Sequence, residues 1–561
     1  MLAARWPAGH CIDEAVGLAC GRTSYVWGSH VASLAPRTTV DGEPSIFTDR
    51  APEWAARTFM AVLVGSFFFW LWIGRGQWFF QDEWHVLVNR DGGDLSDLFE
   101  PHNEHWSTIP VVTYRLLWQV FGLNNYLPYQ VLAVLAHLAI AALLRAIMRR
   151  CGVSPWIATA AASAFALFGY AYKDIIWAFQ MGFAGAVAFG LAQLWLADHD
   201  GPVGRRDAVA LVAGLAALMS SGTGPPLVAA TGLAMLVRRG WRVALLQTAP
   251  LAVIYGAWTM TAGDEAKDLP NGSPDDWVRF AYSGLSRLLP RFTENRFITV
   301  LMIVITLAGL VLGARSHGRA FLRRSAVPLI LALTAVVFFL ITGYGRAHVL
   351  GVEFSQISRY AHVGVALILP VIALGADVIA RRVPGLASAL ALVFVVGGVP
   401  GLQHIETMER RDAPPALILA LAQEVTPGVA DDVRPFPNLT GSRAITLGWL
   451  SDGVASGKIP EPELAEQWNE RARGMLTLGI DTSLPRPEGC RPFTEPIERT
   501  LDGGDQLAFR GPVLVDARLP DGTRIGEPTY SGGDGYRLIA ARDGIDLRVA
   551  PFNDTSRICE P

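Results

Sequence analysis

Long apolar segments separated by short polar loops follow one another along most of the chain. A helix needs about 20 mostly apolar residues to cross the hydrocarbon core of a bilayer. The pattern therefore predicts eleven transmembrane helices. The fifth and sixth are short, so they could instead form a tight hairpin that spans only in part. The predicted segments are 57–74, 127–147, 155–172, 175–197, 207–221, 224–238, 242–261, 297–314, 326–343, 361–380 and 386–402.

Arginine-rich loops indicate how the predicted helices are oriented across the membrane. Every second loop is short and basic, as in "RAIMRRCG", "GPVGRRD", "VRRGWR", "GARSHGRAFLRRS" and "ARRVPG". Lys and Arg accumulate in cytoplasmic loops, so these five loops are expected inside. An odd number of spans then places the N-terminus in the cytoplasm and the C-terminus outside. Residues 1–56 are expected to be a disordered cytoplasmic tail, and 75–126 the first outer loop.

The pattern changes after the last span. Residues 403–561 are more polar, and "EPELAEQWNERARGMLTLG" predicts an amphipathic helix. "GPVLVDARLPDGTRIGE" and "YRLIAARDGIDLRVAP" alternate as strands do. We therefore expect an all-α polytopic membrane bundle over 57–402, followed by a small extracytoplasmic α/β or β-rich domain.

Composition agrees with a multi-pass protein of the plasma membrane. The chain is 51% hydrophobic and 17% charged, whereas soluble domains carry about 25% charged residues. Its net charge of −3 gives no polycation for nucleic acid. The spans hold almost no charged residue at mid-depth, and His137 is the clearest ionisable group. Proton-coupled transporters usually carry buried charges, which counts against a transporter.

The first outer loop concentrates polar chemistry in "FFQDEWHVLVNRDGGDLSDLFEPHNEHWSTIP". Asp82 and Glu83 follow directly on the first span. A carboxylate at a partly desolvated interface has a raised proton affinity, which suits a general base. The alternative is a pair of solvated acids at the end of a span. "TYRLLWQVFG" predicts a short amphipathic helix lying on the membrane.

His102 and His105 are spaced i, i+3, with Glu104 between them. On a helix the two rings would share a face and could bind a metal. The alternatives are hydrogen-bonded interfacial histidines or contacts to an acceptor. In the second outer loop, "YAYKDIIWAFQ", Asp174 could be a second acid and Lys173 could pair with a phosphate. An ordinary Lys–Asp loop explains that pair equally well.

The loop before the tenth span reads "GYGRAHVLGVEFSQISRYAHVG" and supplies basic groups. Arg359 and Tyr360 lie at the start of the span, and Arg346 lies further out. A guanidinium near the membrane suits a lipid phosphate because it offers two parallel donors. The alternative is an interfacial Arg that only snorkels.

Two of the five cysteines, Cys490 and Cys559, fall in the segment expected outside, where thiols oxidise. Cys11, Cys20 and Cys151 fall on the expected inner side. The topology therefore predicts a Cys490–Cys559 disulfide, with two unrelated thiols as the alternative.

An acidic pair after the first span, a large first outer loop, many spans and a C-terminal outer domain together resemble the GT-C superfamily of membrane glycosyltransferases. That superfamily includes protein mannosyltransferases, aminoarabinose transferases and arabinosyltransferases. "PHNEHWSTIPVVTYRLLW" resembles actinobacterial membrane proteins of this plan.

The resemblance implies transfer of a hexosyl or pentosyl group, with inversion, from a polyprenyl-phosphate donor to a cell-envelope glycan, lipid or protein. It makes Asp82 the base, supported by Glu83. Some relatives use a divalent cation (Mg²⁺ or Mn²⁺), for which Asp82, Asp174 and His102 are the candidate ligands. Several carry an outer carbohydrate-binding domain, whereas a structural cap is the alternative here. The other reading of the chain is a non-catalytic envelope assembly protein or a lipid or polysaccharide transporter.

Overall fold

The structure is a computed structural model. It describes residues 51–90, 95–261, 273–398, 402, 413–425, 433–435, 445–481, 488–525, 529–531, 535–541 and 543–559. The cytoplasmic tail expected over 1–56 therefore lies almost wholly outside the described residues. Among the described residues the first helix begins at Ala51, earlier than the predicted start of the first span at 57.

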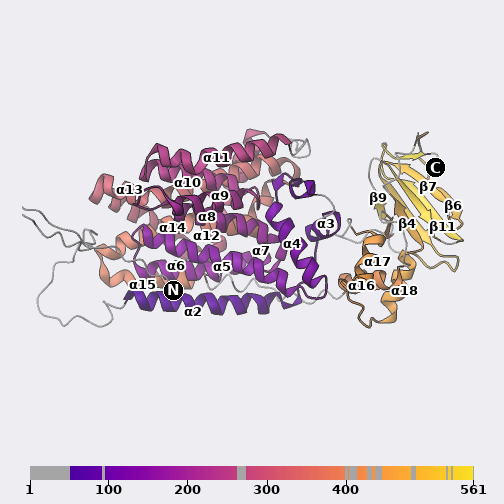
Figure 1. The fold of residues 1–561 in the computed structure, drawn as a ribbon, viewed down its shortest axis with the longest axis horizontal. Helices are drawn as coiled ribbons and strands as arrows, with labels where there is room; N and C mark the ends of the chain where they lie inside the picture. Colours follow the sequence, from indigo (N-terminus) through magenta and orange to yellow (C-terminus); the bar gives the residue numbers. More distant parts are fainter. Residues whose placement is uncertain are drawn as a thin grey trace, which may run out of the picture. The chain divides into compact units, whose positions relative to one another are not determined.

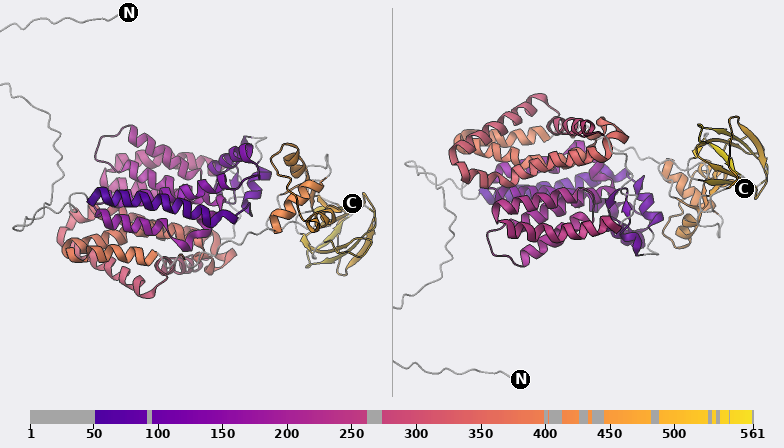
Figure 2. Two further views of the ribbon diagram at one scale, coloured as in Figure 1. Left: turned by 90° about the horizontal axis from the view of Figure 1, so that it is seen from below. Right: turned by 90° about the horizontal axis from the view of Figure 1, so that it is seen from above.

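Each of the eleven predicted apolar segments contains a helix within its described residues, and these helices run side by side in a bundle (Figures 1 and 2). Two of the segments belong to one helix, α13, which kinks at Gly318 (φ 48°) within the expected inner loop. The helices are α2 (Ala51–Ile73), α5 (Leu127–Arg150), α6 (Pro155–Ala166), α8 (Met181–Ala197), α9 (Arg205–Leu218), α10 (Gly224–Arg238), α11 (Trp241–Thr261), α13 (Arg296–Leu350), α14 (Ser358–Arg382) and α15 (Ala387–Gly398).

Seven segments in the described part of the chain are long and apolar enough to cross a membrane, which makes this a multi-pass membrane protein. The others are α6, α9, α10 and α15, with 12, 14, 15 and 12 residues. At about 1.5 Å per residue, each is shorter than the hydrocarbon core of about 30 Å. The number of spans and the orientation of the termini stay predictions.

Shorter elements occupy the connections. The first loop holds η1 (Gly74–Gly76), α3 (Asp82–Asn89), η2 (Ser96–Leu98), the hairpin β1 (Pro101–His102) and β2 (His105–Trp106), and the predicted amphipathic helix α4 (Thr108–Phe121). Further along are η3 (Gly169–Ala171), α7 (Tyr172–Ile176), η4 (Ala178–Gln180), η6 (Val352–Gln356) and η7 (Pro384–Leu386).

One amphipathic helix, α12 (Pro274–Thr293), was missed from the sequence because its pattern is too polar for a span. Its start is set by Ser273, whose hydroxyl accepts from the Asp276 backbone N–H, while the Asp276 carboxylate accepts from the Ser273 backbone N–H. This reciprocal pair satisfies two helix-end donors.

The core of the bundle centres on α14, which is buried along almost its whole length. It crosses α13 at Gly309 and Gly375, where a Cβ on Gly309 would lie 2.2 Å from the Gly375 carbonyl oxygen. Small residues allow such close approach between membrane helices. Because α14 also begins with Ser358-Arg359-Tyr360, this packing positions one wall of the site described below.

The C-terminal region contains α16 (Ala413–Glu424), α17 (Leu447–Ala455), α18 (Glu466–Met475) and two antiparallel sheets, so the expected mixed, β-rich domain is confirmed. The two alternating stretches predicted as strands form β8 (Val513–Arg518), β10 (Tyr536–Ala540) and β11 (Ile545–Pro551). Strands β8 and β11 pair with Val515 opposite Val549. Both sheets contribute to one apolar core, separate from that of the bundle. The strand order of the first sheet is β3 (Val433–Pro435), β4 (Leu478–Asp481), β10 (Tyr536–Ala540), β7 (Gln506–Arg510), β12 (Arg557–Cys559) and β5 (Arg491–Pro492). The strand order of the second sheet is β6 (Ile497–Leu501), β11 (Ile545–Pro551), β8 (Val513–Arg518) and β9 (Thr529–Ser531).

The predicted disulfide between Cys490 and Cys559 is confirmed. Their Cα atoms lie 3.9 Å apart, and the bridge closes a separation of 69 residues. It ties β12 to the segment entering β5, with which β12 also pairs. The bridge therefore holds the end of the chain on the sheet. Among the described residues Cys151 is a free, buried thiol, whereas Cys11 and Cys20 lie outside them.

Candidate active site

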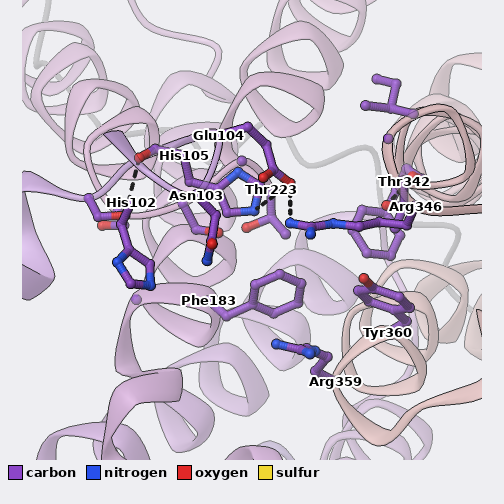
Figure 3. A pocket seen from close by; sticks show the side chains of 18 of the residues that line it. His102, Asn103, Glu104, His105, Phe183, Thr223, Thr342, Arg346, Arg359 and Tyr360 are labelled. Atoms are coloured by element: carbon purple, nitrogen blue, oxygen red, sulfur yellow. Dashed lines mark hydrogen bonds and ion pairs between the residues drawn. The ribbon is translucent and has the colours of Figure 1, made fainter. Parts of the chain in front are cut away.

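A cavity of about 600 Å³ lies among segments that are far apart in the sequence. Its walls come from the first loop, the start of α8, the turn between α9 and α10, the end of α13 and the start of α14. Six of the residues predicted as site residues outside the catalytic pair line it (Figure 3): His102, Glu104, His105, Arg346, Arg359 and Tyr360. Asp82 lines it too.

Asp82 is the first residue of α3 and is only half-buried. Within the described part of the chain its carboxylate takes part in no hydrogen bond or salt bridge. Burial raises the pKa of Asp82, although the positive charges of Arg359, His85 and Arg346 act in the opposite direction. A carboxylate that is free of partners, near cations and of raised proton affinity is suited to accept a proton.

Glu83, the second predicted catalytic acid, is fully buried and does not line the cavity. Its carboxylate accepts hydrogen bonds from the Phe80 backbone N–H (2.7 Å), the hydroxyls of Tyr114 (2.5 Å) and Tyr126 (3.1 Å), and the indole N–H of Trp177 (3.0 Å). These donors come from four segments. The placement fits a supporting role, because Glu83 anchors the first turn of α3 and thereby holds Asp82 in the cavity wall.

We expect Glu83 to make stability depend on pH. Burial raises its pKa to about 7, against the four donors. A folded-state pKa above the ordinary value of 4.5 means that this contribution to stability is complete below pH 4.5 and is lost as pH rises through about 7. The loss amounts to about 3 kcal/mol.

The measurement is the unfolding of the detergent-solubilised protein between pH 4.5 and 8, comparing wild type with Glu83→Gln. His102 affects the pH dependence of stability with the opposite sign, because burial lowers its pKa to about 3. The prediction therefore concerns the difference between the stability curves of wild type and Glu83→Gln. Glu53→Gln, at an exposed position of α2, is the control. Parallel curves for wild type and Glu83→Gln would contradict the expectation.

The cationic wall is formed by Arg346 and Arg359. Arg346 makes an ion pair with Glu104, whose Oε1 also lies 3.7 Å from Nε2 of His105. Arg359 lies over the rings of Phe354 and Tyr360, 5.9 and 5.8 Å from their centroids. No described residue forms a salt bridge with Arg359, so its charge is available to an anion in the cavity.

His102 and His105 do not lie on a helix, so the condition under which their rings would share one helical face is not met. These residues face each other across the hairpin β1–β2, with Asn103 at its turn in a left-handed conformation (φ 50°). His102 packs between the rings of His85 and Phe179. In the described part of the chain no group of three or more His, Cys, Asp or Glu side chains is placed to hold a metal. Binding of a divalent cation therefore stays a prediction.

Asp174, a candidate ligand of the same cation as Asp82, does not line the cavity with Asp82. Asp174 is buried and hydrogen-bonded to Nδ1 of His362 at 2.5 Å. Nε2 of His362 lies 2.9 Å from Nδ1 of His137, and Nε2 of His137 lies 3.1 Å from the Ala166 carbonyl oxygen. This series of hydrogen bonds joins α7, α14, α5 and α6 inside the bundle, consistent with a packing role for His137.

Lys173 is exposed beside the ring of Tyr172 and does not line the cavity, which fits the reading of an ordinary loop lysine.

From the sequence, one buried partner of Asp174 outside the cavity and one segment of the cavity wall were missed. His362 stands in the quoted "SRYAHVG", but only the fold shows that it meets Asp174. Residues of the stretch "SSGTGPP", over 220–226 between the fifth and sixth predicted spans, also line the cavity. Its two prolines at the start of α10 were the available signal, because they have no backbone N–H to donate to a side chain that precedes the helix.

No protein-family model and no curated protein matches the sequence. Two solved structures are similar to it. ArnT from Cupriavidus metallidurans bound to undecaprenyl phosphate is 16% identical, with 71% of this chain and 85% of that chain covered and a TM-score of 0.45. ArnT from the same organism in the apo state is 13% identical, with 81% and 93% covered and a TM-score of 0.43.

Proposed function

We propose that the protein is a GT-C-type membrane glycosyltransferase. It transfers a sugar from a polyprenyl-phosphate donor to a cell-envelope acceptor on the outer face of the membrane, with inversion. One observation carries this: the Asp82 carboxylate and the Arg359 guanidinium, neither of which forms a salt bridge with any described residue, line the same cavity. A base and a phosphate-binding cation in one partly apolar chamber are what such a transfer needs.

In the proposed reaction the acceptor hydroxyl oxygen attacks the anomeric carbon from the face opposite the phosphate. The bond between the anomeric carbon and the phosphate oxygen breaks, and polyprenyl phosphate leaves with the electron pair. Asp82 takes the hydroxyl proton as the new bond forms. Arg359, with Arg346 nearby in its ion pair with Glu104, stabilises the negative charge on the leaving phosphate.

Part of the cavity wall is apolar and lies on a candidate membrane span. Ile341 and Leu350 line the cavity, yet they are 53% and 43% exposed on the second half of α13, which is one of the candidate spans. Exposed apolar side chains on a membrane helix face lipid. We therefore infer that the cavity opens toward the bilayer along α13, so that a polyprenyl tail lies in lipid while its phosphate reaches Arg359.

The test uses the full-length protein in nanodiscs with a panel of undecaprenyl-phosphate sugars and an envelope extract as acceptor source. Mass spectrometry measures the released undecaprenyl phosphate. We expect release with at least one sugar, and its loss in Arg359→Ala but not in Arg287→Ala, an exposed arginine of α12 outside the cavity.

Binding of undecaprenyl phosphate to the same variants separates the two readings of the chain. If wild type binds the lipid but releases none from any donor, the non-catalytic or transporter alternative is favoured. If wild type and Arg359→Ala behave alike in both assays, the assignment of the phosphate site fails.

A further inference from the structure

The cavity has a second wall, opposite in character to the arginines, made by the hairpin β1–β2 and the turn 220–226. The two segments are in close contact. Next to them, the Ile109 backbone N–H at the start of α4 donates to the carbonyl of Met219, the residue before the turn, at 3.0 Å. A Cβ on Gly222 would lie 2.6 Å from Nδ1 of His105, so only glycine lets the turn approach this closely.

Thr223 stands on this wall in an unusual chemical situation. It immediately precedes α10, where a threonine hydroxyl ordinarily accepts from the N–H of the second or third helical residue. Those residues are Pro225 and Pro226, which have no N–H. Thr223 is 3% exposed, and its hydroxyl has no hydrogen-bond partner among the described residues. The two prolines therefore leave the buried Thr223 hydroxyl at the cavity without a hydrogen-bond partner among the described residues.

His102 is the matching group on the hairpin. It is 7% exposed, and neither ring nitrogen has a hydrogen-bond partner in the described chain. A neutral imidazole offers one donor and one acceptor. Buried polar groups are nearly always hydrogen-bonded, and an unsatisfied one costs free energy. Two such groups lining one cavity indicate that something in the cavity completes their hydrogen bonds (Figure 3).

We propose that Thr223 and His102 form a subsite for the hydroxyl groups of a neutral sugar. This rests on the proposed function and deepens it. The one acid on this wall, Glu104, is neutralised by its ion pair with Arg346. Hydroxyl groups can donate to and accept from both side chains, whereas a charged sugar substituent would find no counter-charge. The arginines hold the phosphate, and the sugar extends from it toward the hairpin.

The test compares the binding of undecaprenyl phosphate with that of undecaprenyl-phosphate sugars to the full-length protein in nanodiscs. We expect Thr223→Val and His102→Phe each to weaken the binding of the preferred sugar-linked lipid about tenfold. Binding of the bare lipid should not change. Thr342→Val is the matched control, because the Thr342 hydroxyl already donates to the Phe338 carbonyl.

The possible outcomes distinguish failure of the proposed subsite from failure of the proposed function. If both variants bind the sugar-linked lipids as wild type does and still transfer sugar with unchanged KM values, the subsite is overturned and the proposed function stands. If only the KM of the acceptor rises, the hydroxyls recognised belong to the acceptor, and the assignment to the donor sugar is overturned. If wild type binds neither lipid, both proposals fail.

Discussion

Replacing Asp82 by Asn is expected to lower the rate of sugar transfer by about 10²- to 10⁴-fold, the usual contribution of a general base. The amide keeps the shape of the side chain but cannot accept the acceptor proton. Since the carboxylate bonds to no described residue, its removal leaves no group unsatisfied, and the protein should fold normally. The measurement is the initial rate of undecaprenyl phosphate release at saturating donor, together with the affinity for undecaprenyl phosphate.

Asp275→Asn is the matched control, because Asp275 is exposed at the start of α12 and does not line the cavity. A fall in kcat with retained lipid binding is the expected signature of a lost base. Transfer at the wild-type rate by Asp82→Asn would remove Asp82 from the mechanism. Loss of lipid binding would instead assign it to the donor site.

The largest expected effect on stability is that of Asp174→Ala, which should lower the free energy of unfolding by about 3–5 kcal/mol. His137 can donate to the Ala166 carbonyl only through Nε2, so its Nδ1 must accept from Nε2–H of His362. Nδ1 of His362 then shares one proton with Asp174, as imidazolium with carboxylate or imidazole with carboxylic acid. Removing the carboxyl group leaves His362 buried without this partner.

Asp174→Asn serves as the comparison, because its amide N–H can donate to Nδ1 of a neutral His362 and should cost less. Reversible unfolding in mixed detergent micelles gives both values. The double variant of Asp174 and His362 to Ala should be less destabilising than the sum of the single variants, because the residues share one interaction. Additive effects, or an Asp174→Ala variant as stable as wild type, would contradict the assignment.

The helical course of the membrane part could be predicted because each apolar segment carries its own signal. A membrane helix satisfies its backbone hydrogen bonds internally, so the pattern of a single segment suffices. α12 was missed for the same reason, since an amphipathic helix packed on its neighbours has no uniform apolar run. The disulfide was predictable because only two cysteines fall in the segment expected outside.

By itself the sequence determined the helical bundle, the β-rich C-terminal region, the Cys490–Cys559 bridge and the concentration of polar residues in the first loop. Only the tertiary structure decided which of two adjacent acids lines the cavity. Successive helical residues point about 100° apart, and contacts from other segments set which direction is buried. Likewise, Asp174 meets a histidine 188 residues away rather than the cavity. A contact between distant segments depends on how the helices pack, and no local pattern records it.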